Sequence, residues 1–147
     1  MNTKILLMGV VLLLSACAPR AQSGQPLVEV WKSPTCQCCS KWVEHLRQSG
    51  FNVTVHNESA MNPLKAQLGV PQNLASCHTA KVAGYVIEGH VPAQDIRKLL
   101  SDKPKVLGLA VPGMPIGSPG MEQGDRKDAY ETLAFTAGAE STVYAKH

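Results

Sequence analysis

The 147-residue sequence has little of what marks several large protein classes. Aromatic residues make up only 5% and charged residues 17% of it, and the 14 basic against 11 acidic side chains leave a net charge of +3. The basic residues are scattered, so no nucleic-acid footprint is indicated. The 44% apolar content, with no internal repeat, excludes a disordered tail, a coiled coil, a collagen-like chain and a polytopic membrane protein. One ordinary domain is expected.

The first 16 residues differ from the rest. They hold one charge, Lys4, followed by an apolar run over 5–14 that is too short to span a bilayer permanently. The run ends in Leu14-Ser15-Ala16-Cys17, which resembles the bacterial lipobox, where the signal is cut before a cysteine that becomes lipidated. We therefore expect 1–16 to be a lipoprotein signal peptide. An ordinary signal peptide with an incidental cysteine is the alternative.

Lipidation at Cys17 would make residues 17–26 a tether, because this segment has no periodicity and little to bury. The folded domain would then be 27–147, held on a membrane surface by its acyl chains. Ala18 stands where an aspartate would suggest retention at the inner membrane, so we expect the outer membrane, facing the periplasm.

Apolar periodicity predicts alternating strands and helices over the first part of the domain. The expected order is strand 27–31, helix 39–50, strand 51–56, helix 62–68, strand 81–88 and a helix opening at Pro92. This order predicts an α/β fold, a small mixed sheet with flanking helices and right-handed crossovers. Residues 103–128, rich in proline, glycine and methionine, are expected to form a long loop, and 130–135 with 141–145 a C-terminal hairpin.

Three cysteines, Cys36, Cys38 and Cys39, fall between the first expected strand and helix. A helix N-terminus lowers thiol pKa values, and thiolates attack disulfides and bind metals. Cys36 and Cys39 satisfy C-x-x-C, while Cys38 and the distant Cys77 add sulfurs that suit Cu(I) or another thiophilic ion. Structural disulfides remain the alternative, and spacing selects no pairing among the four cysteines. The paired motifs of a zinc module are absent.

Soft thioethers lie on the proline- and glycine-rich loop. Met114 and Met121 follow no helical core spacing, so they are candidate metal contacts, or else fillers that pin the loop to the core.

The histidines give weaker signals. His78, beside Cys77, could be a ligand or tune a pKa, whereas His90 is expected to cap the following helix. His45 and His56 are expected to be solvated, and His147 to lie at a frayed end. Trp31 and Trp42 are expected in the core, with shielding of the sulfur cluster as a further role.

Four segments together resemble one family. They are Cys36-x-Cys38-Cys39, Ser76-Cys77-His78-Thr79, the run from Gly84 to Pro92 and the run from Gly108 to Met121. They look like the exported, thioredoxin-like metal-binding family that includes the copper-resistance protein CopG of proteobacteria, over roughly residues 28–147. The resemblance implies a thioredoxin-like fold that handles copper in the bacterial envelope, with sulfurs at Cys36, Cys38, Cys39 and Cys77 as the redox and copper-binding groups. The lipobox is where this chain departs from the family.

The leading hypothesis is an envelope copper-binding, redox-active protein, which as an enzyme would be a copper oxidoreductase. Cys36 and Cys39 would form its catalytic dithiol, the four domain cysteines would hold Cu(I), and His78, Met114 and Met121 would pass the ion. Expected partners are copper ions, other envelope copper-resistance proteins, a thiol reductant and the membrane, without nucleic acid. Two alternatives stay open: a thiol–disulfide oxidoreductase with Cys36 as nucleophile and Cys39 as resolving thiol, and a passive metal chaperone or buffer.

Overall fold

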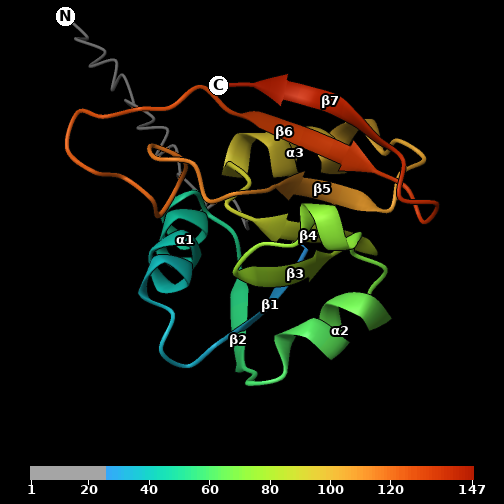
Figure 1. Ribbon diagram of the computed structural model, residues 1–147, viewed down its shortest axis with the longest axis horizontal. Coiled ribbons are helices and arrows are strands. Elements are labelled where there is room, and N and C mark those ends of the chain that lie inside the picture. Colours follow the sequence, from blue (N-terminus) through green and yellow to red (C-terminus); the bar gives the residue numbers. More distant parts are fainter. Residues whose placement is uncertain (1–25) are drawn as a thin grey trace, which may run out of the picture.

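One mixed sheet of seven strands organises the protein in the computed structural model, which describes residues 26–147 (Figure 1). The expected signal peptide, Cys17 and nearly all of the tether lie outside the described residues. The elements in chain order are β1 (Val28–Lys32), α1 (Gln37–Gln48), β2 (Val53–Asn57), α2 (Met61–Gln67), a 3₁₀ turn (Gln72–Leu74), β3 (His78–Val82), β4 (Tyr85–Gly89), α3 (Ala93–Asp102), β5 (Gly108–Val111), β6 (Glu131–Phe135) and β7 (Ser141–Lys146). In the described part of the chain, no helix is long and apolar enough to cross a membrane.

The strands lie in the order β2-β1-β3-β4-β5-β6-β7. Two neighbouring pairs, β1 with β2 and β4 with β5, are parallel, and the remaining pairs are antiparallel. This confirms the expected mixed α/β architecture and the C-terminal hairpin, β6–β7. The predicted first two strands and three helices are also present, with bounds shifted by a few residues.

Two apolar clusters occupy different sides of the strands because successive strand residues point to opposite faces. The larger cluster joins α1 and α3 to the sheet, through residues such as Trp42, Leu46, Ile96 and Leu99 packed with Ile87 and Leu109. The smaller cluster covers the neighbouring positions Val86 and Ala110 with Val70, Leu74 and Phe135. The segment around α2 therefore covers the face opposite α1 and α3.

Two sequence predictions were wrong. The expected single strand over 81–88 is a hairpin, because Ala83 and Gly84 both have positive φ angles, +47° and +90°, and reverse the chain between Val82 and Tyr85. This backbone matches the two-residue turns of β-hairpins, but alanine is an uncommon residue there, so the turn gave no sequence signal. The expected loop over 103–128 contains a buried strand, β5, between β4 and β6.

Candidate metal centre

The first turn of α1 presents three cysteines at one end of the sheet. Cys36 is the N-cap residue, and its Sγ atom accepts a hydrogen bond from the Cys39 amide at 3.3 Å. A disulfide joins Cys36 to Cys39, whose Cα atoms lie 5.4 Å apart. Trp42, Val43 and Leu46 anchor the same helix in the core. This packing holds Cys39 buried, while Cys36 and Cys38 stay partly exposed.

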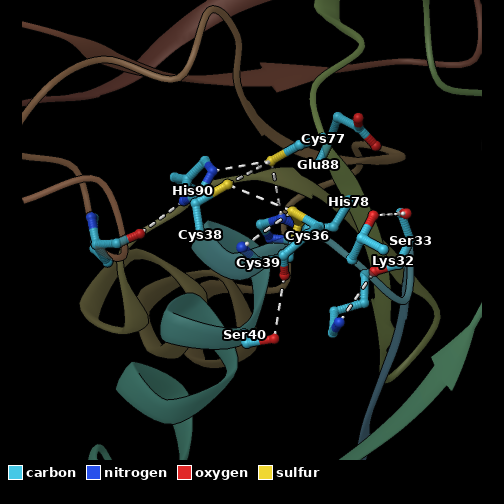
Figure 2. Close-up of a disulfide and its surroundings, with 12 residues drawn as sticks. Lys32, Ser33, Cys36, Cys38, Cys39, Ser40, Cys77, His78, Glu88 and His90 are labelled. Atoms are coloured by element: carbon cyan, nitrogen blue, oxygen red, sulfur yellow. Dashed lines mark hydrogen bonds between the residues drawn. A yellow bond between two sulfur atoms is a disulfide. The ribbon is translucent and has the colours of Figure 1, made fainter.

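The fourth cysteine reaches these three from the start of β3. The Sγ atom of Cys38 lies 3.5 Å from that of Cys36 and 4.0 Å from that of Cys77 (Figure 2). The four sulfur atoms all lie within 4.8 Å of one another, so one ion or a small cluster could contact all of them once the Cys36–Cys39 disulfide is reduced. The structure thus brings together every cysteine predicted as a metal ligand within residues 27–147, and Cys38 and Cys77 are free thiols.

The β3–β4 hairpin places imidazoles beside Cys77. Thr79 pairs with Glu88, and extending this antiparallel register by two residues sets Cys77 opposite His90. The Sγ atom of Cys77 lies 3.0 Å from Nε2 of His90 and 3.4 Å from Nδ1 of His78. These three donor atoms also lie within 4.8 Å of one another. His78 therefore lies in the cluster, where its role as a ligand stays a prediction, and His90 lies there too although a capping role was predicted.

The glycine-rich loop between β5 and β6 fixes the orientation of His90. The Nδ1 atom of His90 lies 2.8 Å from the carbonyl oxygen of Pro119, to which it can only donate. The next residue, Gly120, has φ +87°, and a Cβ atom there would lie 2.7 Å from the Cys38 carbonyl oxygen. Glycine thus lets the loop rest directly on the first turn of α1. In Figure 1 this orange segment passes the end of α1.

Burial controls the charge of the cluster. It raises the pKa of Cys77 to about 12, with the neighbouring Cys38 adding to the rise, so the metal-free group is a thiol at neutral pH. Burial also lowers the pKa of His90, and it lowers the pKa of His78 further, with His90 and Lys65 contributing. Both imidazoles are therefore neutral and offer a lone pair. The ring of Trp42 covers His78, with centroids 4.3 Å apart, so this tryptophan is a core residue that also shields the cluster.

A buried ion pair supports the Cys77 side from the α2 face. Lys65 Nζ lies 2.5 Å from Glu88 Oε1, and both side chains are at most 7% exposed. The same Glu88 oxygen accepts a hydrogen bond from the Ser76 amide at 2.6 Å, and Thr79 donates to the other oxygen at 2.7 Å. Burial raises the pKa of Glu88, and Lys65 opposes that rise. The carboxylate therefore holds the backbone immediately before Cys77.

The remaining predicted residues have different surroundings. Met114 is 44% exposed, and Met121 is partly buried after Gly120. The metal contacts of both thioethers stay a prediction. Trp31 is half-buried rather than in the core and stacks on His56 at 5.1 Å, and the His56 side chain is 41% exposed.

Three histidine expectations were wrong for reasons of tertiary packing. His45 is half-buried, and its Nε2 accepts a hydrogen bond from the Ala93 amide, so His45 rather than His90 caps α3. The His147 side chain is only 13% exposed, with Nε2 2.9 Å from Asp95 Oδ2. The pairing register of the β3–β4 hairpin would have indicated that His90 lies opposite Cys77. That register could not be assigned from the sequence because the turn at Ala83 was not recognised.

Comparisons with known proteins show which family the chain belongs to. Residues 74–121, which include Cys77, His78 and His90, match the family described as "Protein of unknown function, DUF411". A solved structure entitled "Copper resistance protein copG- Form 2" is 45% identical, with a TM-score of 0.80 over 84% of this chain and 99% of the other. The chain belongs to the CopG family. "Copper resistance protein copG- Form 1" is 46% identical, with a TM-score of 0.79 over 84% and 98%. No curated protein matches.

Family membership and donor chemistry point the same way. The copG structures are named for copper resistance, and the cluster in this chain consists of thiols and imidazoles without a carboxylate ligand. Thiols select soft ions such as Cu(I), and imidazoles suit several transition metals, copper among them. The residues present therefore fit copper as cargo.

Proposed function

We propose that this protein handles copper in the bacterial envelope and holds Cu(I) on the sulfurs of Cys36, Cys38, Cys39 and Cys77. The observation that supports this most strongly is the convergence of the four sulfur atoms within 4.8 Å, from two separate segments of the chain. A purely structural role would leave two disulfides, whereas Cys38 and Cys77 lie 4.0 Å apart as free thiols. The two copG relatives, named for copper resistance, add to the argument.

The proposed redox step uses Cys36 and Cys39 as a dithiol. Two Cu(II) ions each take one electron, the two thiols form the Cys36–Cys39 disulfide, and two protons are released. An external thiol reductant then restores the dithiol by disulfide exchange. Cys36 at the N-cap of α1, directly after β1, supports this step, because such positions lower thiol pKa values. The β1–α1–β2 unit followed by the β3–β4 hairpin and α3 is the thioredoxin-like arrangement that we propose.

We further propose that Met114 and Met121 pass the ion along the loop, and that a lipid on Cys17 anchors the protein at the outer membrane, facing the periplasm. Other envelope copper-resistance proteins would then exchange copper with it. A thiol–disulfide oxidoreductase acting on envelope proteins is the second candidate. The partly exposed Cys36 bonded to the buried Cys39 favours it, since these are the positions of an attacking and a resolving thiol.

Anaerobic titration of the fully reduced protein with Cu(I), in competition with a colorimetric Cu(I) chelator, tests the binding. The wild type and Cys17→Ser should bind equally, and Cys38→Ser/Cys77→Ser should lose at least about a hundredfold in affinity, two steps of about tenfold. Full retention in the double variant would sink the proposal. For the redox step, each disulfide formed should consume two Cu(II) ions. In a Cys38→Ser background, which removes the second thiol pair, Cys36→Ser/Cys39→Ser should abolish this. Rapid insulin reduction without copper turnover would favour the second candidate.

A further inference from the structure

The described chain enters the fold at the end of the sheet opposite the cysteines. β1 begins at Val28, and the register pairs Val28 with Val82, the last residue of β3. The other end of β1, Lys32, pairs with His78 and leads through a short turn to Cys36. The five residues of β1, at about 3.3 Å each, therefore set the entry point about 16 Å from the end of the strand that leads to the cysteines.

Three segments of the chain come together around this entry point. Leu27, directly before β1, is 51% exposed although it is apolar. The exposed turn at Ala83 and Gly84 follows β3, whose last residue pairs with the first residue of β1. The segment between α3 and β5 lies beside this turn, because the Tyr85 hydroxyl donates to the Pro104 carbonyl at 3.1 Å. We call the exposed residues of these segments the entry surface: Leu27, Ala83, Gly84, Lys103 and Lys105.

The entry surface carries positive charge that no neighbouring carboxylate neutralises. Among the described residues, neither Lys103 nor Lys105 has a carboxylate oxygen within 4.0 Å. The adjacent Asp102 pairs instead with Lys98. At the cysteine end, by contrast, the loop over 121–128 has three acidic and two basic side chains. The charge therefore differs in sign between the two ends.

We propose that the entry surface rests on an anionic phospholipid bilayer and that the cysteine cluster points away from the membrane. This inference rests on the proposed lipid at Cys17 and adds the orientation of the anchored domain. The ten residues 17–26 span at most about 35 Å, so the bilayer stays close to the residues at which β1 begins. Each lysine near an anionic bilayer shifts the balance toward contact by about fivefold. The exposed Leu27 adds apolar contact at the interface.

This orientation suits the proposed exchange of copper and electrons. The partly exposed Cys36 and Cys38 then face the aqueous side, from which copper ions and a thiol reductant arrive. The opposite orientation would press these sulfurs and the acidic loop over 121–128 against a bilayer of the same charge as the loop. The two ends of the sheet thus divide the work, one for attachment and one for chemistry.

The test uses the full-chain lipidated protein purified from a bacterial host. The protein is placed in vesicles of phosphatidylethanolamine and phosphatidylglycerol, and in neutral vesicles of phosphatidylethanolamine and phosphatidylcholine. Acetylation of each lysine is followed by mass spectrometry. Lys103 and Lys105 should react at least about fivefold more slowly in the anionic vesicles. The exposed Lys41 and Lys127 near the cysteine end, and alkylation of the Cys38 thiol, should be the same in both.

A pair of charge-matched variants gives a second readout, amide hydrogen exchange at the turn of Ala83 and Gly84. In the wild type, anionic vesicles should slow this exchange relative to neutral vesicles. Lys103→Gln/Lys105→Gln should lose the protection, whereas Lys41→Gln/Lys127→Gln, which removes the same charge near the cysteine end, should keep it. Both double variants should bind Cu(I) as the wild type does, because neither changes a sulfur or imidazole donor.

Equal reactivity of Lys103 and Lys105 in the two kinds of vesicle would overturn the inference. Protection of Lys41, Lys127 or Cys38 in place of the entry surface would overturn it as well. If mass spectrometry finds no lipid on the wild type, the anchor proposal fails by itself. The same vesicles added to that unlipidated chain then decide the inference, which stands if the two entry-surface lysines are protected and falls if they are not.

Discussion

The Nε2 atom of His90 lies 3.0 Å from the Sγ atom of Cys77, and the two residues flank one β-hairpin, Cys77 just before β3 and His90 just after β4. The antiparallel register between β3 and β4 creates this contact. The loop carbonyl of Pro119 then orients the ring from its other side. The donor set is thus assembled by α1, the β3–β4 hairpin and the loop before β6 together.

Copper binding should release the proton of Cys77. The pKa of this thiol is raised to about 12, chiefly by burial, so the metal must displace the proton throughout the neutral range. The Cu(I) affinity of the reduced protein should therefore rise at least about tenfold per pH unit between roughly pH 6 and 8. Competition titrations across that range measure the slope. Cys77→Ser should lower the slope by one proton, and an unchanged slope would refute this assignment.

The Lys65–Glu88 pair should show strong energetic coupling. Glu88→Gln leaves the Lys65 ammonium buried without its counter-charge, and we expect about 3 to 5 kcal/mol of destabilisation. Lys65→Met/Glu88→Gln removes both charges and keeps an amide oxygen for the Ser76 amide, so this double variant should be more stable than Glu88→Gln alone. Urea unfolding of the wild type, both single variants and the double variant gives the coupling energy. Additive effects would contradict the paired role.

Gly120 should be required for the contact between the loop and α1. Gly120→Ala would place a Cβ atom 2.7 Å from the Cys38 carbonyl oxygen, in addition to straining a φ of +87°. Gly113→Ala is the matched control, because Gly113 has φ +77° and a Cβ atom there would meet nothing within 4 Å. We expect about 1 to 2 kcal/mol of destabilisation for the control from φ strain, and more for Gly120→Ala. Only Gly120→Ala should weaken copper binding, and equal effects of both variants would contradict this reasoning.

The metal-free protein should lose stability in mild acid. Burial lowers the folded-state pKa of His78 and of His90 below 6.5, so below about pH 6.5 the unfolded chain binds protons that the folded chain excludes. Each histidine should then cost about 1.4 kcal/mol per pH unit as the pH falls toward its folded-state pKa. Urea unfolding between about pH 7.5 and 5.5 measures this. His90→Gln should reduce the slope by one proton, and an unchanged slope in this variant would contradict the assignment.

Lipid attachment at Cys17 is tested in a bacterial host by labelling with radioactive palmitate and by membrane fractionation. The wild type and Cys77→Ser should incorporate label and sediment with the outer membrane. Cys17→Ser should lose the label and appear in the soluble envelope fraction, because acyl chains provide the membrane affinity. Label retained in Cys17→Ser would show that the lipobox interpretation is wrong.

The sequence alone determined the chemistry of the site, because that information is local. Three cysteines at the start of an amphipathic helix identify the sulfur donors whatever the rest of the fold does. The same local patterns predicted α1, its flanking strands and the C-terminal hairpin. The residues near Cys77 that are close in sequence, such as His78, were found in the same way.

Only the tertiary structure decided which distant groups meet these sulfurs. His90 reaches Cys77 through a turn at Ala83 and Gly84, and the alanine at its first position hid this turn from sequence-based prediction. The same turn pairs Glu88 with Thr79. Lys65 lies on α2 and Pro119 in the loop after β5. No local sequence pattern in either segment indicates that Lys65 contacts Glu88 or that Pro119 contacts His90. Local patterns specify elements and donor types, whereas the register of a hairpin and the packing of a loop depend on contacts between remote residues.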